Sequence, residues 1–179
     1  MLSYELLEGK LRQTMANKPI AFSLTVLALG AGVLISATNA FAGATVATLS
    51  GKCTSFVAMG ISADPALCKN QVMNIEMPNG RNGFAFFLNK PNGESAMVTF
   101  FGDGNKQVHK DKDHATQPID RVRFKFQEST DDLKAVGTCS FANPYMRKPV
   151  TTECRATTSK GDFSGKFTSD GVSPNLSEM

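Results

Sequence analysis

The chain has 179 residues, of which 41% are hydrophobic, and its 19 Lys and Arg against 16 Asp and Glu give a formal net charge of +3 at pH 7. A protein that binds nucleic acid irrespective of sequence needs a strong basic excess, because neutralised phosphates supply most of its affinity. The charge balance therefore excludes that class, and we expect no nucleic-acid partner.

Residues 1–42 have the features of a secretory signal peptide. Basic residues precede an almost wholly apolar run over 19–35, and Ala40-Phe41-Ala42 supplies small residues at both positions that a signal peptidase reads. Met15 begins a leader of more usual length and is a second candidate initiator. Because the apolar run is shorter than the ~20 residues of a spanning helix, an uncleaved anchor is the weaker alternative. We expect cleavage before Gly43, a periplasmic or secreted location, and no transmembrane span in the mature chain.

All four cysteines follow the leader, and an exported chain meets oxidising conditions, so two disulfides are expected. We predict Cys53–Cys68 and Cys139–Cys154, because each pair encloses 14 residues. The second pair also closes a hairpin: with Cys139 facing Cys154, Phe141 lies against Thr152 and one face is mostly apolar. A zinc site is the weaker alternative, since no Cys-x-x-Cys spacing occurs.

The first half of the mature chain predicts short strands separated by turns. β-forming residues over 44–49 indicate a first strand, and a second apolar run follows at 56–57. Asp64 and Pro65 are typical of an N-cap and a first helical position, so one helical turn is expected up to Cys68. Alternation over 71–77 then predicts another strand.

Segments 84–88 and 96–101 predict a hairpin that is apolar on both faces. Such strands usually lie in the middle of a sheet that is covered on two sides. The alternative is that one face docks another molecule, because monomers rarely expose large apolar patches.

The second half begins with a polar segment over 102–118, which we interpret as a loop. In the strand over 119–127, Val122, Phe124 and Phe126 are expected to face inward. After Cys154 the chain turns at 159–162 and returns, and in a four-residue-loop register Gly165 lies opposite Ala156, leaving room for a phenylalanine ring. Residues 171–179 are predicted to be a flexible tail.

The strand count is about eight or nine, and no segment is amphipathic over a length sufficient for a substantial helix. This pattern predicts an all-β fold over 43–170, an antiparallel sandwich or small barrel with one short helical turn and two disulfides. With 13 Phe and no Trp, the core is expected to be built largely on phenylalanine.

Two segments are candidate binding surfaces. Arg121, Arg123 and Lys125 fall on one strand face, spaced ~6.6 Å apart, and suit an anionic partner or a negative protein surface. Tyr145, followed by Arg147 and Lys148 at the tip of the disulfide hairpin, resembles a recognition loop. Solvated outer faces are the simpler interpretation of both.

A metal site is a further alternative in the polar segment. It holds His109, Asp111, Asp113 and His114, whose imidazole and carboxylate groups suit a transition metal or calcium. Neighbouring lysines oppose cation binding, however, and the calcium-loop spacing is broken. We found no nucleophile motif or phosphate-binding loop either.

The sequence therefore predicts an exported, non-enzymatic module without a cofactor, which binds or supports another cell-envelope component, either a protein or an anionic molecule. The runner-up is a small periplasmic hydrolase or metal-dependent enzyme centred on the loop from His109 to His114. A passive structural protein with no discrete site is the third possibility.

Overall fold

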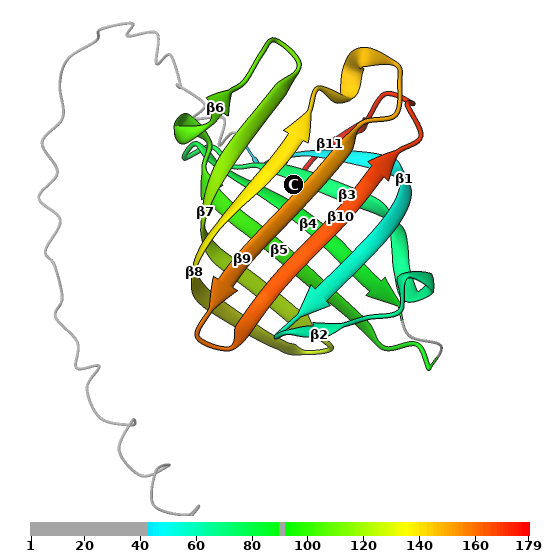
Figure 1. Ribbon diagram of the computed structural model, residues 1–179, viewed down its shortest axis with the longest axis vertical. Helices are drawn as coiled ribbons and strands as arrows, with labels where there is room; N and C mark the ends of the chain where they lie inside the picture. Colours follow the sequence, from blue (N-terminus) through cyan, green and yellow to red (C-terminus); the bar gives the residue numbers. More distant parts are fainter. Residues whose placement is uncertain (1–42, 90–91) are drawn as a thin grey trace, which may run out of the picture. The chain divides into compact units, whose positions relative to one another are not determined.

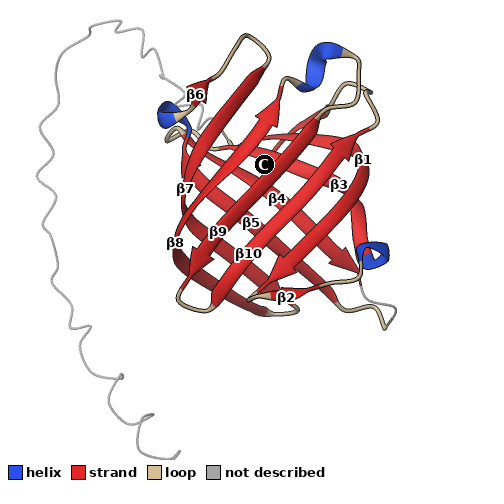
Figure 2. Ribbon diagram, viewed as in Figure 1, coloured by secondary structure: helices blue, strands red, loops and turns tan. Residues whose placement is uncertain are grey.

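The computed structural model describes residues 43–89 and 92–179, and the expected signal peptide over 1–42, with its candidate start Met15, lies outside the described residues. Figure 2 shows that the described chain is mostly strand. Its helical segments are three short 3-10 turns. The all-β prediction is confirmed.

Eight long strands make the body of the fold, and three short strands and three turns are attached to it. The long strands are β1 (Thr45–Ala58), β3 (Cys68–Glu76), β4 (Arg81–Asn89), β5 (Ser95–Asp103), β7 (His114–Phe126), β8 (Ser129–Ala142), β9 (Thr151–Thr158) and β10 (Gly161–Ser169). The short strands are β2 (Ile61–Ser62), β6 (Val108–His109) and β11 (Asn175–Glu178), and the turns are η1 (Pro65–Leu67), η2 (Gly104–Lys106) and η3 (Pro144–Met146).

Each long strand pairs antiparallel with the next long strand along the chain, and β10 pairs back onto β1. The sheet therefore closes into an eight-stranded up-and-down barrel, as Figure 1 shows. Of the two architectures that the sequence allowed, the barrel is the one formed. Closure satisfies the backbone hydrogen bonds that an open sheet would leave at its two edges.

Strand β1 joins the two apolar runs that the sequence suggested as separate segments. It is continuous over 14 residues, with a bulge where the pairing to β10 shifts between Cys53 and Ser55. A bulge bends a strand and increases its twist. One strand can therefore follow β3 on one side while it closes the barrel against β10 on the other.

Both predicted disulfides are present. Cys139 lies directly opposite Cys154 in the β8–β9 ladder, and both are completely buried. The other bridge joins Cys53 of β1 to Cys68, the first residue of β3. The predicted helical turn precedes Cys68 as η1, with the Asp64 carboxylate accepting a hydrogen bond from the backbone N–H of Ala66 at 2.9 Å.

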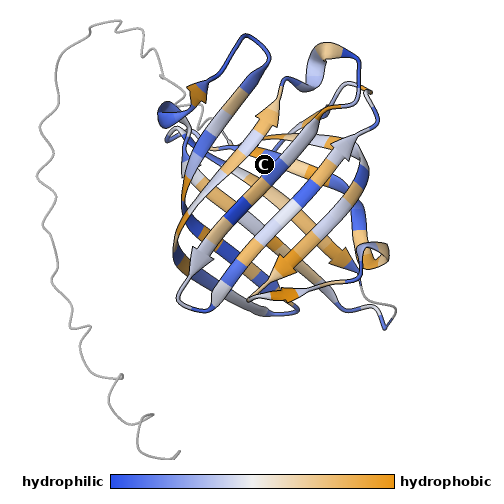
Figure 3. Ribbon diagram, in the orientation of Figure 1, coloured by the Kyte–Doolittle hydropathy of each residue, from blue (hydrophilic) through white to orange (hydrophobic). Residues whose placement is uncertain are grey.

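Phenylalanine side chains fill the barrel, as predicted. Figure 3 shows apolar residues alternating with polar ones along the strands. The inward members include five fully buried rings: Phe56, Phe86, Phe100, Phe163 and Phe167. Phe86 crosses to the opposite wall, where a Cβ on Gly165 would lie only 2.6 Å from its ring. The predicted space beside Gly165 thus accommodates Phe86.

The final hairpin has a tighter turn than the sequence analysis assumed. Gly161 pairs with Thr158, so Gly165 lies opposite Cys154 and not Ala156. The Thr158 hydroxyl donates to the Gly161 carbonyl at 3.0 Å and accepts from the Lys160 N–H at 3.1 Å, while Gly161 takes a φ of 110°. Glycine adopts that backbone conformation without steric cost, which permits the two-residue connection.

The C-terminal segment differs from the flexible tail expected over 171–179. Asn175–Glu178 form β11, which pairs antiparallel with Thr45–Thr48 of β1. The ladder between β1 and β10 begins only at Gly51, so the residues of β1 that precede Gly51 have an edge that β10 does not cover. The hydrogen bonds available at that edge order the segment.

Strands β4 and β5 pair as predicted, in the middle of the sheet between β3 and β7. On the outer face, Ala85, Thr99 and Phe101 are 0%, 1% and 4% exposed. The Phe101 ring lies against Gly83, and the Arg123 guanidinium is 5.5 Å from the ring centroid. Neighbouring side chains therefore contribute to covering this outer face.

We predict that Gly165→Ala lowers the free energy of unfolding by about 1–3 kcal/mol, because overpacking forces side chains or backbone to shift. The intrinsic strand preference of Ala over Gly acts in the opposite direction. Urea unfolding under non-reducing conditions measures the effect. In a Phe86→Leu background, where the ring is gone, the same substitution should cost less than half as much; an equal cost in both backgrounds would contradict the contact.

Candidate binding site at the barrel mouth

A pocket of about 310 Å³ opens at the end of the barrel where β1 begins and β3 ends. It is lined from six strands and from η3, by Thr45, Ala47, Leu49, Asn74, Glu76, Phe84, Phe141, Ala142, Pro144, Tyr145, Thr152 and Leu176. We call it the mouth pocket. Its volume lies at the lower end of the ~300–1,000 Å³ typical of small-molecule sites.

Two aromatic rings lie side by side in the mouth pocket. Phe84 and Phe141 have ring centroids 4.8 Å apart and planes inclined at 42°. Below them the barrel is filled by the buried phenylalanines. The pocket is therefore a depression above a packed core, and apolar contact is the main interaction that its deeper part offers.

Polar groups line the mouth pocket beside this apolar surface. Asn74 donates to the Asn82 side-chain oxygen at 2.6 Å and to the Gly83 carbonyl at 3.3 Å, which fixes its amide. Thr152 is 5% exposed, and no described residue forms a hydrogen bond with its hydroxyl. Every wholly buried polar side-chain atom among the described residues has a partner, so the Thr152 hydroxyl is accessible from the pocket.

The pocket exists because the barrel wall changes at this end. The β8–β9 ladder ends at Phe141 and Thr152, so Asn143 does not continue it against Val150, contrary to the register expected from sequence. Instead the Asn143 N–H donates to the Asp113 carbonyl at 2.7 Å, and the Val150 N–H donates to the Ser169 hydroxyl at 3.0 Å. The chain between them forms η3, which carries Tyr145 to the pocket.

The hairpin-tip residues predicted as a binding surface separate into two groups. Tyr145 lines the mouth pocket and is 54% exposed. Its backbone N–H donates a hydrogen bond to the side-chain oxygen of Asn143 at 3.0 Å. Arg147 and Lys148 are exposed on the same loop but do not line the pocket. Only the tyrosine of this trio therefore belongs to the cavity.

The predicted basic strand face lies on the outside of β7, away from the mouth. Arg121, Arg123 and Lys125 face outward as expected, with Val122 and Phe124 between them in the core. Arg123 forms an ion pair with Asp132, with 2.8 Å between Nη2 and Oδ2. This hydrogen bond lowers the pKa of Asp132. The positive charge that this face offers to a partner is therefore less than the sequence suggested.

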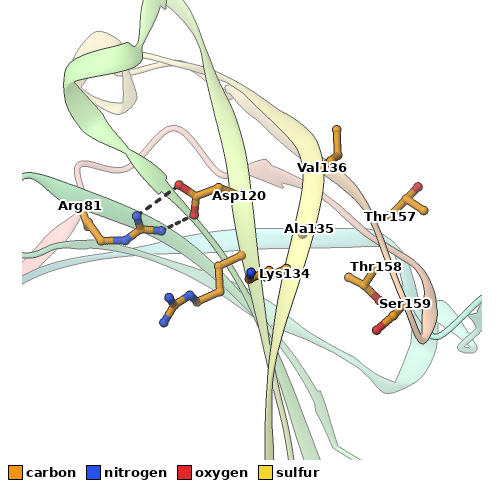
Figure 4. A pocket seen from close by; sticks show the side chains of 9 residues that line it. Arg81, Asp120, Lys134, Ala135, Val136, Thr157, Thr158 and Ser159 are labelled. Carbon is orange, nitrogen blue, oxygen red and sulfur yellow. Dashed lines mark hydrogen bonds and ion pairs between the residues drawn. The ribbon is translucent and has the colours of Figure 1, made fainter.

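A second pocket, of about 540 Å³, lies on the outer wall beside Arg121 and Lys134 (Figure 4). A bulge in β7 between Ile119 and Arg121 places the Asp120 carboxylate outward, where it forms an ion pair with Arg81. Hydrogen bonding from Arg81 lowers the pKa of Asp120. The pocket is thus built around a neutralised pair.

The four residues of the alternative metal site do not converge. His109 belongs to β6, whereas His114 begins β7 and its Nδ1 lies 2.9 Å from each oxygen of Asp111. The Asp111 carboxylate also accepts the N–H groups of Asp113 and His114, at 2.7 and 2.8 Å. Within residues 43–89 and 92–179, no group of three or more His, Cys, Asp or Glu side chains is placed to hold a metal ion. The Asp111 side chain instead holds the connection between β6 and β7, so much of the expected polar loop is a short hairpin.

Sequence reasoning missed most of the mouth pocket, because its lining comes from residues 45 to 176 and closure alone brings them together. Leu176 lies in the segment that the sequence predicts to be a flexible tail. It is the one apolar residue of Asn175–Glu178, so no alternation typical of a strand marks this segment.

Comparison with protein-family models, curated proteins and solved structures found no match for this chain. In the part of the chain that the structure describes, no helix is long and apolar enough to cross a membrane.

We predict that the Arg81–Asp120 pair makes a pH-dependent contribution to stability. Because the folded-state pKa of Asp120 is lowered, its contribution is present above the unfolded-state pKa of about 3.9 and is lost as the pH falls through the folded value. For an exposed pair we expect at most about 1 kcal/mol. Asp120→Asn should therefore destabilise the fold at pH 7, and this loss should shrink as the pH falls below about 3.9, measured by urea unfolding. Adding Arg81→Met to Asp120→Asn should change little at pH 7, and fully additive losses would contradict the pairing.

Proposed function

We propose that this chain is an exported, non-enzymatic binding module, periplasmic or secreted, which holds another component of the cell envelope in the mouth of its barrel. The observation that carries the proposal is a concave, mostly apolar pocket at one end of a barrel that is otherwise filled with side chains. Eight-stranded barrels have room either for a packed interior or for one small ligand. Here the packed part ends below the mouth.

The composition of the pocket supports binding over catalysis. Among its twelve lining residues there is no histidine, cysteine or lysine, and all four cysteines of the chain form disulfides. Glu76 is the one acidic residue of the lining, and it is exposed. Apolar surface with a few convergent polar groups is the usual composition of a binding site.

The outer face of β7 offers a second, weaker contact. Arg121 and Lys125 are exposed there, and Lys134 lies directly opposite Arg121. Like charges placed directly opposite across a ladder are unfavourable, and an anionic envelope component would relieve their repulsion. We assign this face to orientation at a negatively charged surface, and the mouth pocket to ligand retention.

Ala47→Phe places a ring in the mouth pocket and should abolish ligand retention. The protein is isolated from the envelope of cells that express the full chain, and native mass spectrometry measures the bound mass. Ile61→Phe is the matched control, because Ile61 is 71% exposed and lies in β2, which pairs with the far end of β1. We expect the bound mass in the wild type and in Ile61→Phe, and its loss in Ala47→Phe. A protein without any bound component, or an equal mass in all three, would contradict the proposal.

A further inference from the structure

We propose that the mouth pocket selects an amphiphile with a cationic head, namely an alkyl or aryl group that carries an ammonium. This inference rests on the proposed binding function and names its ligand class. It follows from how charge is distributed around the pocket. The rim of the pocket is acidic, whereas the outer face of β7 is basic.

Two carboxylates flank the entrance on the β1 side. In the ladder, Thr45 pairs with Glu76 of β3 on one side and with Glu178 of β11 on the other. Thr45 and Glu76 line the pocket, as does Leu176 two residues before Glu178. Because alternate residues of a strand share a face, Glu178 projects to the same side as Leu176. The three neighbouring strands therefore present Glu76, Thr45 and Glu178 in one row.

Neither carboxylate is neutralised within the described part of the chain. The ion pairs of the described residues join other carboxylates, such as Asp120, Asp132 and Glu153, to Arg or Lys, and no unprinted contact involves Glu76 or Glu178. No lysine or arginine lines the mouth pocket. An ammonium group at this rim would meet two negative charges, whereas an anionic head would be repelled by both.

The deeper lining specifies the other end of the ligand. Below the acidic row lie Ala47 and Leu49 on one side, and the paired rings of Phe84 and Phe141 on the other. An alkyl chain or a single ring removes this surface from water, which is the main favourable contribution to binding of an apolar group. The accessible hydroxyl of Thr152 provides one hydrogen bond near the rings.

Two positive charges lie on the η3 loop, which contributes Tyr145 to the lining. Arg147 and Lys148 are exposed beside Tyr145 but outside the lining. If they determined the head-group preference, the pocket would select an anionic amphiphile. That outcome is the direct alternative, and a ligand series that varies only the head group distinguishes the two.

The test compares octylammonium, octanol and octanoate, and in parallel the phenylethyl ammonium, alcohol and carboxylate analogues. Isothermal titration calorimetry on the purified full-chain protein at pH 7 and low ionic strength gives each dissociation constant. We expect the ammonium compound of at least one series to bind about tenfold more tightly than its alcohol, with the carboxylate weakest. The preference should decline at high salt, because the rim is exposed.

Variants connect that preference to the acidic row. Glu76→Gln with Glu178→Gln should reduce the ammonium-over-alcohol ratio to near one, while the alcohol still binds. Glu128→Gln, which removes one carboxylate charge at the opposite end of the barrel, should leave the ratio unaltered. An unchanged ratio in the Glu76→Gln and Glu178→Gln protein, or a carboxylate that binds as tightly as the ammonium, would overturn the inference.

The same experiment separates the inference from the function on which it rests. If the alcohol and the carboxylate bind equally well and Ala47→Phe abolishes both, the mouth pocket is a binding site and only the charge selection is wrong. If no compound of either series binds the wild-type protein, the inference is overturned, and the envelope-component experiment with Ala47→Phe decides the proposed function separately.

Discussion

The antiparallel pairing of β10 with β1 is the constraint on which the rest of the structure depends. It converts a nearly sequential meander into a closed barrel wall, and it requires β1 to pair with both β3 and β10. The bulge after Cys53 accommodates that geometry, and the bridge to Cys68 holds the bulged segment against β3. Closure also brings Gly165 within contact of Phe86 from the opposite wall. The aromatic core therefore depends on this pairing as much as on hydrophobicity.

The mouth pocket follows from the unequal lengths of the two closing strands. Strand β1 continues beyond the last residue of its ladder with β10, and β11 covers the remaining edge. Opposite it, the β8–β9 ladder stops at Phe141, and η3 follows. A depression is left between β11 and η3, with aromatic rings in its wall and carboxylates at its rim. The same short strand thus satisfies backbone hydrogen bonds and contributes Leu176 to the pocket.

The local parts of this fold could be predicted from the sequence, whereas the parts that depend on closure could not. Cysteine spacing and period-two alternation determine the β8–β9 hairpin, and Asp64 with Pro65 determines η1, because each signal lies within about fifteen residues. The choice between sandwich and barrel depends on a pairing between residues more than a hundred positions apart. The mouth pocket depends on the same pairing. Arg123 illustrates a further limit, since its partner Asp132 lies on the next strand and neutralises a charge that the sequence presents as available.

The division between a filled barrel and an irregular mouth has a consequence for how such a protein can change over time. Both disulfides and the buried phenylalanines belong to the core of the barrel. The lining of the pocket, in contrast, includes η3 and β11, whose residues are largely exposed. Substitutions in η3 or β11 can alter the shape and polarity of the mouth pocket while the barrel keeps its stability. The fold therefore permits this end of the molecule to diverge at little cost to folding, and the stable base makes it a suitable scaffold on which recognition surfaces can be selected.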